Sequence, residues 1–271
     1  MQLSKILIAA LGAASLAVGT MAHADVLDDI KKRGKLVVGV KADYKPFGFR
    51  DPSGKIIGVE PDLAAEVAKK LGVELELIPV VSANRMEFLN QGKIDLMIAT
   101  MSDNAARRKV VQVIEPLYYS DAVNVLQKKG TPIAKWEDLK DKKLCGTTGA
   151  FYNKDITQKY GPEIISFDGS EKPLLALKNG DCVGYLYDQT FIVGKLSEDE
   201  WKSGFEMKLP GMMETPWAMA VKPGEAGLQK VMEDLTKEWM RAGTIVELEK
   251  KWNVPPTDYA KRMHEAAKKG S

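Results

Sequence analysis

The sequence predicts an α/β protein in which one pattern of alternating strands and helices occurs twice. In the first half, the apolar runs Lys35–Val40 and Leu75–Val80 flank Leu63–Leu71, whose apolar residues recur at helical spacing. In the second half, further strand-like runs follow Pro132 and end with Cys182–Tyr187. Strands that alternate with helices in this way are typical of a parallel sheet with covering helices, and the repetition indicates two similar lobes.

Residues 1–24 have the pattern of a secretory signal peptide. Lys5 precedes the mostly apolar run Ile6–Val18, and residues 22–24 form an A-x-A cleavage site. The run is too short for a comfortable membrane span, and charged residues follow it directly. We therefore expect the signal to be cleaved before Asp25 and the mature protein to be a soluble periplasmic product.

Composition and charge argue against several classes of function. The formal charge is only +2, with acids and bases interspersed, so no surface for nucleic acid is indicated. The only histidines are His23, in the signal, and His264, near the end of the chain. A folded core without histidine disfavours Ser-His-Asp and Cys-His hydrolases and His-rich zinc sites. The sequence has no glycine-rich phosphate loop, and we expect no cofactor.

The N-terminal half places polar loops at the ends of buried strands. The loop Lys41–Phe47 follows the first strand, at the end where open α/β sheets bind ligands. Asp51–Gly54 is typical of a turn, and Gly72 is expected to end the helix that precedes it. The strand Leu75–Val80 leads through a second polar loop into the expected helix Arg85–Asn90.

One stretch predicts an anion-binding site. Ile94–Ala99 is expected to be a buried strand, followed by a loop that carries the hydroxyls of Thr100 and Ser102. Asn104 is a good N-cap for a helix that contains Arg107 in its first turn. Free N–H groups, the helix dipole and two parallel N–H bonds from the arginine would all favour a carboxylate. The alternative is an exposed arginine on an ordinary capped helix.

The second half contains both cysteines of the chain, Cys145 and Cys182. They lie in the strand-like runs Lys143–Gly146 and Asp181–Tyr187. Export permits a disulfide, and two buried thiols are the alternative; the bridge is favoured if the two strands are neighbours. The other expected elements are the strand Ala122–Gln127, helices from Tyr152 and over Leu174–Lys178, a strand from Trp217, helices Leu228–Ala242 and Ile245–Trp252, and a charged, loosely docked helix Asp258–Lys269.

Several sequence motifs occur along the chain in a characteristic order. They are Val38-Gly39-Val40 with Tyr44-x-Pro46-Phe47, Gly58-Val59-Glu60-x-Asp62-Leu63-Ala64, Asn84-Arg85, Gly92-Lys93-Ile94-Asp95, the T-x-S-x-x-x-x-R of Thr100, Ser102 and Arg107, the loop Thr147–Gly149, and Asn179-Gly180-Asp181 with Asp188. Over nearly all of the mature chain, this ordered set resembles the periplasmic solute-binding proteins of polar amino-acid ABC importers, the family 3 type. Within that family it looks closest to members that bind aspartate or glutamate.

The resemblance implies a type II periplasmic binding protein fold. Two α/β lobes, each a sheet flanked by helices, would be joined by crossover strands near Ser120–Val125 and Pro210–Ala218. Lobe 1 would comprise residues 25–120 and 215–271, the latter including a C-terminal helical tail, and lobe 2 would comprise residues 121–214. The ligand would lie in the cleft between the lobes.

The resemblance also implies roles for individual residues. The α-carboxylate of an amino acid would bind Arg107, assisted by Thr100 and Ser102. The α-ammonium would bind Asp188, for which a helix cap or a surface acid is the alternative, and Tyr44 would close over the aliphatic part of the ligand. Because this chain lacks the Ser/Thr pair that many members carry in the lobe 2 loop, that loop would contribute backbone N–H groups, at Thr148, Ala150 and Phe151.

Side chains on the lobe 1 wall indicate an acidic ligand. Lys41 and Arg85 are expected to face the cleft, with Ser82 beside Arg85. Two cations with no obvious acid to pair them favour a ligand with a second carboxylate, glutamate or aspartate. The alternative is that Arg85 braces Asp62 or Glu60 and that Lys41 is solvated.

We therefore expect a monomeric protein that captures a polar, acidic amino acid and delivers it to the membrane permease of an ABC importer. A cyclohexadienyl dehydratase-like enzyme, acting on prephenate or arogenate, is the alternative on the same fold. Such chemistry needs a general acid, and Glu60 or Glu214 would have to serve without a supporting motif. A receptor sensor or a cell-wall lyase would carry a membrane segment or an appended domain, which the sequence does not indicate.

Overall fold

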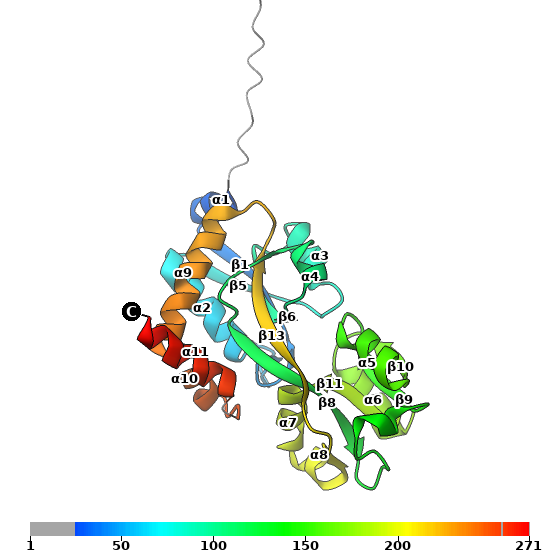
Figure 1. Cartoon of the computed structure of the whole chain (residues 1–271). Helices are drawn as coiled ribbons and strands as arrows, with labels where there is room; N and C mark the ends of the chain where they lie inside the picture. Colours follow the sequence, from blue (N-terminus) through cyan, green and yellow to red (C-terminus); the bar gives the residue numbers. More distant parts are fainter. Residues whose placement is uncertain (1–24, 256, 271) are drawn as a thin grey trace, which may run out of the picture.

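Two long strands join the two lobes of the molecule. The structure, a computed structural model, describes residues 25–255 and 257–270, and the expected signal peptide lies outside these residues. Figure 1 shows strands β8 (Tyr119–Lys128) and β13 (Met212–Val221) passing between the lobes. They overlap the stretches in which the sequence predicts the crossovers, and the two-lobed α/β architecture is confirmed.

A mixed sheet runs through both lobes in the strand order β10-β9-β11-β8-β13-β6-β1-β5. In lobe 1, β1 pairs in parallel with β5 and β6, and in lobe 2, β9 pairs in parallel with β10 and β11. Between them, β8 and β13 pair in antiparallel fashion. Besides β8 and β13, the strands are β1 (Lys35–Val40), β2 (Asp43–Tyr44), β3 (Gly48–Arg50), β4 (Ile56–Ile57), β5 (Glu74–Pro79), β6 (Leu96–Ser102), β7 (Gln112–Val113), β9 (Lys143–Thr147), β10 (Glu163–Phe167), β11 (Gly184–Asp188) and β12 (Phe205–Glu206).

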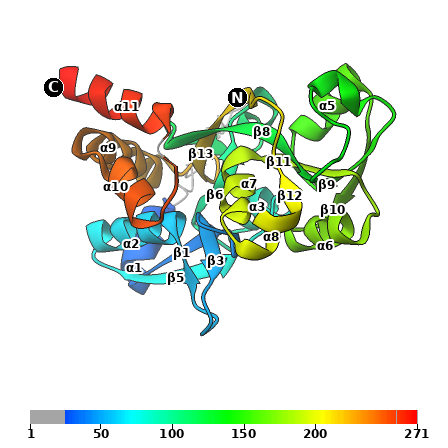
Figure 2. The same ribbon diagram turned by 90° about the horizontal axis from the view of Figure 1, so that it is seen from below.

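Helices cover both lobes. Figure 2 shows α9, α10 and α11 gathered on one side of lobe 1, whereas α5 and α6 lie on opposite sides of β9 and β10 in lobe 2. None of the helices in residues 25–255 and 257–270 combines the length and apolarity that crossing a membrane requires. The helices are α1 (Val26–Arg33), α2 (Val59–Leu71), α3 (Arg85–Asn90), α4 (Ala105–Arg108), α5 (Tyr152–Tyr160), α6 (Glu171–Asn179), α7 (Gln189–Leu196), α8 (Asp199–Gly204), α9 (Ala226–Ala242), α10 (Thr244–Lys251), α11 (Asp258–Lys269) and the 3₁₀ helix η1 (Trp136–Leu139).

Cap residues explain where the predicted helices begin and end. The Asn104 side chain accepts the backbone N–H of Arg107 at 2.9 Å, as the sequence predicts for the start of α4. Gly72 and Gly243 adopt left-handed φ angles of 70° and 75° and end α2 and α9, because glycine takes this conformation without a steric penalty.

The structure corrects the predicted end of one strand. Strand β6 continues to Ser102, so Thr100 and Ser102 lie in the strand rather than in a loop. The extension follows from pairing, since Ser102 stands opposite Trp217 of β13. Thr100 has a φ of 45°, in the left-handed region, close to the point where the register of this pairing shifts. A left-handed residue in a strand is typical of a bulge, which bends the strand locally.

The disulfide prediction is confirmed. Cys145 and Cys182 are bonded, with Cα atoms 5.6 Å apart. Cys145 lies in β9 and Cys182 lies two residues before β11, and these two strands are neighbours in the sheet. The bridge therefore ties α6, which lies between the two cysteines in sequence, to the sheet of lobe 2.

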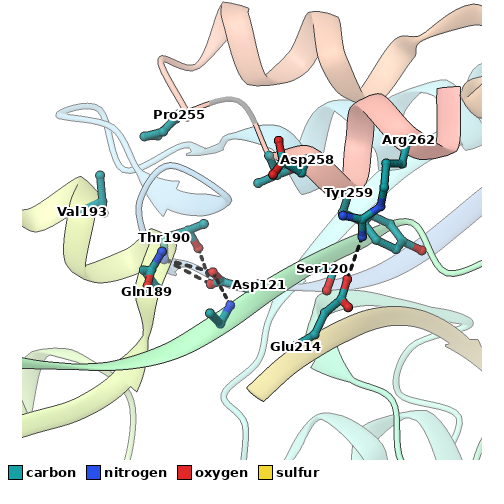
Figure 3. A pocket seen from close by; sticks show the side chains of 12 residues that line it. Ser120, Asp121, Gln189, Thr190, Val193, Glu214, Pro255, Asp258, Tyr259 and Arg262 are labelled. Atoms are coloured by element: carbon teal, nitrogen blue, oxygen red, sulfur yellow. Dashed lines mark hydrogen bonds and ion pairs between the residues drawn. The ribbon is translucent and has the colours of Figure 1, made fainter. Parts of the chain in front are cut away.

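The C-terminal helix α11 is firmly docked, and the prediction of loose docking is wrong. The Tyr259 hydroxyl donates to the carbonyl of Leu117 at 2.9 Å. A ring nitrogen of His264 lies 2.8 Å from the carbonyl oxygen of Met240. Figure 3 shows the ion pair of Arg262 with Glu214 of β13. Ala260, in the first turn of α11, is buried.

Candidate functional site

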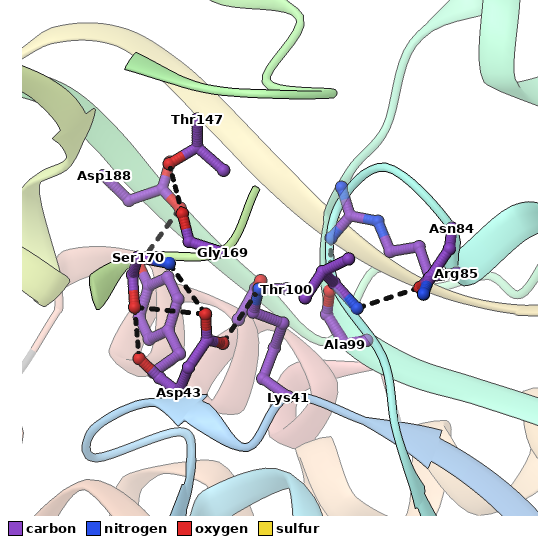
Figure 4. Close-up of polar contacts among 12 residues, drawn as sticks. Lys41, Asp43, Asn84, Arg85, Ala99, Thr100, Thr147, Gly169, Ser170 and Asp188 are labelled. Atoms are coloured by element: carbon purple, nitrogen blue, oxygen red, sulfur yellow. Dashed lines mark hydrogen bonds and ion pairs between the residues drawn. The ribbon is translucent and has the colours of Figure 1, made fainter. Parts of the chain in front are cut away.

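The candidate site lies where the carboxyl ends of strands from both lobes meet. Lys41 directly follows β1, Arg107 lies in α4 just after β6, and Asp188 is the last residue of β11. Ligands of open α/β sheets bind at this end of the strands. Figure 4 shows Lys41, Arg85 and Asp188 gathered in one region, although the first two belong to lobe 1 and the third to lobe 2.

Arg107 is a buried arginine that reaches across the two lobes. Its side chain donates to the carbonyl of Ser102 at 2.6 Å and to the carbonyl of Gly149, in lobe 2, at 2.9 Å. The guanidinium carbon lies 5.5 Å from the centre of the Phe151 ring, within the range of a cation–π contact. Burial, with the nearby positive charge of Arg85, lowers the pKa of Arg107. The alternative of an exposed surface arginine is therefore wrong.

Asp188 is a buried carboxylate held by two tyrosines. One of its oxygens accepts the Tyr152 hydroxyl at 2.9 Å, and the other accepts the Tyr44 hydroxyl at 3.1 Å. Burial raises the pKa of Asp188, whereas these hydroxyls and the charges of Arg85 and Lys41 act in the opposite direction. Asp188 stands at the N-cap position of α7 but makes no side-chain cap bond, and it is 5% exposed. It is therefore neither a side-chain cap nor a surface acid.

Lys41 has an acidic partner that the sequence analysis missed. Its ammonium nitrogen is buried and lies 3.1 Å from the Asp43 oxygen Oδ1. The other oxygen of Asp43 accepts the backbone N–H of Ser170, in lobe 2, at 2.8 Å. The expectation that Lys41 lacks an acid is wrong, and so is the alternative that Lys41 is solvated. Within the described residues, neither Lys41 Nζ nor Asp43 Oδ1 makes a regular hydrogen bond.

Arg85 is also buried, and it points toward the same region. It donates to the carbonyl of Ala99, and its Nε has no hydrogen-bond partner among the described residues. Burial lowers its pKa, and the charge of Asp188 acts in the opposite direction. Arg85 does not brace Asp62, which accepts instead from Lys251, at 2.7 Å, and from the Trp252 indole. An unpartnered buried donor is costly unless a ligand or water fills it.

Glu60 lies behind these cations on the lobe 1 side. One of its oxygens accepts the Thr100 backbone N–H and the Tyr118 hydroxyl, each at 2.6 Å. Burial raises the pKa of Glu60 to about 7, although nearby Lys41 and Arg85 favour its charged form. The N–H of Thr100 is therefore engaged with Glu60.

The lobe 2 loop is packed closely against lobe 1. The N–H of Thr148 donates to the carbonyl of Phe167 at 2.8 Å, and the N–H of Ala150 donates to that of Thr147 at 3.1 Å. Both N–H groups are thus used inside lobe 2, which contradicts the expectation that they face a ligand. Gly149 has a φ of +84°, and a Cβ at this position would stand only 2.8 Å from the backbone of Ser82. Ser82, beside Arg85, therefore marks a place where the lobes touch.

Sequence reasoning named most of the charged residues that meet here but not their partners. The structure brings Lys41, Arg85, Arg107, Tyr44 and Asp188 into one connected region. It adds partners that sequence reasoning did not name, Asp43, Tyr152 and Ser170. A pocket of about 460 Å³ opens beside this region, lined from lobe 1 by residues that include Asp43 and Asn84 and from lobe 2 by residues that include Ser170.

Comparison with known proteins places this geometry in a family. The model of the bacterial extracellular solute-binding proteins, family 3, matches residues 36–255. The ABC transporter glutamine-binding protein of Bacillus subtilis (strain 168) is 31% identical over 84% of this chain and 84% of its own length. The glutamate/aspartate import solute-binding protein of Escherichia coli (strain K12) is 26% identical over 87% of this chain and 82% of its own length.

A solved structure supports the same conclusion. The crystal structure of a cysteine-binding protein from Campylobacter jejuni superposes with a TM-score of 0.79 at 27% identity, covering 84% of this chain and 92% of that one. The matched relatives are transporter solute-binding proteins and not enzymes.

Proposed function

Because this chain belongs to the bacterial extracellular solute-binding proteins of family 3, we propose that it captures a polar α-amino acid in the periplasm for an ABC importer. The observation that carries this proposal is the pairing of opposite charges across the lobes. Arg107 stands on lobe 1 and Asp188 on lobe 2, both buried, and the contact of Arg107 with Gly149 and the bond of Asp188 to Tyr44 each bridge the lobes. A zwitterion satisfies both groups at once, whereas either charge buried alone is costly.

The proposed binding step uses donors that the protein does not fully occupy. An arginine carries five N–H donors, and the bonds to Ser102 and Gly149 use two of them. The α-carboxylate would accept from the remaining donors of Arg107, and the α-ammonium would donate to Asp188. Since one end of the ligand contacts each lobe, the amino acid would bind the closed form better than an open form and shift the population toward closure.

For the ligand side chain, we propose an acidic group first, that of glutamate or aspartate. Lys41 Nζ is ion-paired with Asp43 but makes no regular hydrogen bond, and Arg85 Nε has no hydrogen-bond partner among the described residues; a ligand carboxylate would accept from both of these buried donors. Glutamine is the second candidate. Asp43 Oδ1 accepts no regular hydrogen bond from the described residues, so a carboxamide could accept from Lys41 and donate to Asp43. The relatives named as binding glutamate/aspartate and glutamine fit these two candidates.

The test is a thermal-shift screen of the purified protein against the twenty L-amino acids, followed by calorimetry on those that stabilise it. At a ligand concentration of 100 times Kd, stabilisation should reach about 2.7 kcal/mol. We expect L-glutamate or L-aspartate to give the largest shift, and a larger shift with L-glutamine would assign the Lys41–Asp43 pair to a carboxamide. If no amino acid stabilises the protein, the proposed function is wrong.

The cellular part of the proposal needs separate tests. Mass spectrometry of protein recovered from the periplasm should show Asp25 as the N-terminus. Size-exclusion chromatography with light scattering should give a monomer. An enzyme of the dehydratase type would convert prephenate or arogenate, and we expect no turnover. Glu214 is exposed and paired with Arg262 at 3.0 Å, and Glu60 lies behind the cations, where one of its oxygens accepts from Thr100 and Tyr118.

A further inference from the structure

A chain of four oxygen atoms connects the ligand-binding region to the opposite side of the hinge. Asp121, in β8, accepts the Thr190 hydroxyl at 2.6 Å. The Thr190 oxygen lies 3.4 Å from the Tyr44 hydroxyl oxygen, and Tyr44 donates to Asp188 at 3.1 Å. The four residues come from a crossover strand, from α7, from lobe 1 and from β11, so the chain passes through the junction of the lobes.

The row of four oxygens has one proton too few to make a hydrogen bond in every gap. Three gaps separate the oxygens of Asp121, Thr190, Tyr44 and Asp188, but the two hydroxyls supply only two protons when both carboxylates are ionised. The threonine then donates to Asp121 and the tyrosine to Asp188, which leaves no proton in the gap between the hydroxyls. That gap, 3.4 Å, is the longest of the three. One additional proton on Asp121 would reverse the Thr190 hydroxyl and complete three bonds directed at Asp188.

Both ends of the chain lie among other charged and titratable groups. Burial and the charge of Asp188 raise the pKa of Asp121 to about 7. The groups near Asp121 are Tyr119, Tyr44, Asp188 and, around the pocket that it lines, Glu214, Asp258, Tyr259 and Arg262. The groups near Asp188 are Tyr44, Tyr152, Tyr185, Tyr187, Lys41, Arg85, Arg107 and Asp121.

Asp121 can exchange its proton without passing through the ligand cleft. It lines a pocket of about 320 Å³ at the hinge, together with Ser120, Thr190 and residues of α11. Figure 3 shows Asp121 in this pocket, bonded to Thr190. Water in this pocket would therefore reach Asp121 even when the lobes are closed on a ligand.

We propose that Asp121 is a positioning residue for amino-acid binding, which shares one proton with Asp188 through Thr190 and Tyr44 and loses it to solvent when the ligand binds. This inference rests on the proposed function, in which the ligand ammonium binds Asp188. The ammonium neutralises Asp188 and donates hydrogen bonds to it, so the pair no longer favours the additional proton. That proton leaves Asp121 for water in the hinge pocket, and ligand binding is linked to the release of up to one proton.

The test is calorimetric titration with L-glutamate and, in parallel, L-glutamine at about pH 7, in phosphate and in Tris, whose ionisation enthalpies differ. The wild-type protein should show a buffer-dependent heat that corresponds to proton release. Its Kd should rise as the pH is lowered from about 8 to about 6, and the rise should approach tenfold per pH unit below the pKa of the Asp121–Asp188 pair. Neither ligand titrates in that range, so the change would come from the protein. Asp121→Asn should abolish the release and flatten the profile to less than about twofold per pH unit.

Matched variants separate this linkage from structural damage. Asp258→Asn changes another acid of the same pocket that is not part of the chain, and it should release protons as the wild type does. Thr190→Val keeps the shape of the side chain but removes the hydroxyl between Tyr44 and Asp121, so it should reduce the proton release. This variant tests the linkage independently of whether Asp121→Asn folds. Glu60 is also a buried acid whose pKa is raised to about 7, but it is not part of the oxygen chain. Glu60→Gln should therefore retain the proton release.

The outcomes distinguish the two proposals. Binding of L-glutamate or L-glutamine without proton release in the wild type overturns the role of Asp121 and leaves the proposed function intact. Release that disappears in Glu60→Gln but persists in Asp121→Asn also overturns it. If none of the twenty amino acids binds, the proposed function fails and the inference fails with it.

Discussion

The substitution Arg107→Ala removes the group to which we assign the ligand carboxylate. In the structure this guanidinium is buried and bonded to the carbonyls of Ser102 and Gly149, so a carboxylate bound there would be largely desolvated. Truncating one partner of a buried, hydrogen-bonded charge pair costs about 2–5 kcal/mol. Since about 1.4 kcal/mol is a tenfold change, Kd should rise by roughly 30-fold to several thousand-fold.

The assay is isothermal calorimetry with the best ligand of the amino-acid screen, with circular dichroism to verify folding. Arg107→Lys keeps a positive charge but loses the fork of parallel N–H donors, and an intermediate loss is expected. Arg108→Ala is the matched control on the same short helix. That neighbour is partly exposed and pairs with Asp103 and Glu115, at 2.7 and 2.6 Å, so its removal should leave Kd within about twofold. A folded Arg107→Ala protein that binds as tightly as the wild type would refute the assignment.

Three further predictions concern closure and stability. Gly149→Ala would place a Cβ 2.8 Å from the backbone of Ser82, so the closed form should be disfavoured. We expect weaker ligand binding and, in X-ray scattering of the ligand-bound protein, a larger radius of gyration. An unchanged Kd and radius of gyration would contradict the close contact. Replacing Cys145 and Cys182 by serine opens a link between residues 37 apart and should cost about 2–4 kcal/mol in chemical denaturation, whereas a loss under about 1 kcal/mol would contradict a stabilising bridge. The pKa of Glu60 is raised to about 7, so the contribution of Glu60 to stability is full at low pH and is lost as the pH rises through that value. In urea titrations between about pH 4.5 and pH 7.5, Glu60→Gln should therefore lose less stability than the wild type, by up to about 3 kcal/mol. Parallel curves for the two proteins would contradict the raised pKa.

The sequence predicts the parts of the fold that local patterns specify. Lys35–Val40 is recognisable because its apolar run is continuous, and Gly72 ends its helix because glycine accepts the left-handed conformation. Strand β10 (Glu163–Phe167) was not predicted, since its residues are only half-buried or exposed and give no continuous apolar run. Helices α7 and α8 directly follow the end of β11 and were missed as well.

The candidate site shows the same division between local and long-range information. Arg107 and Asp188 could be selected because each follows an apolar strand, and strand ends are where such sheets bind ligands. The pairing of Lys41 with Asp43 was missed because a spacing of two in a loop does not indicate a contact. Asp43 is in turn held by Ser170, which is distant in sequence and reaches it only when the lobes meet.

The oxygen chain at the hinge was beyond any local pattern for the same reason. Its members, at positions 44, 121, 188 and 190, come from three separate segments of the chain. Periodicity and caps describe neighbours along the backbone, whereas this arrangement depends on how the crossover strand, α7 and lobe 1 pack together.

The central claim is that the two ends of one amino acid are bound by opposite lobes. The most direct measurement is a calorimetric comparison of the best L-amino acid with two analogues, its N-acetyl derivative and the amine that lacks the α-carboxylate. We expect each analogue to bind at least about 30-fold more weakly, because each leaves either Asp188 or Arg107 buried without its partner. An analogue that binds as tightly as the amino acid itself would contradict it.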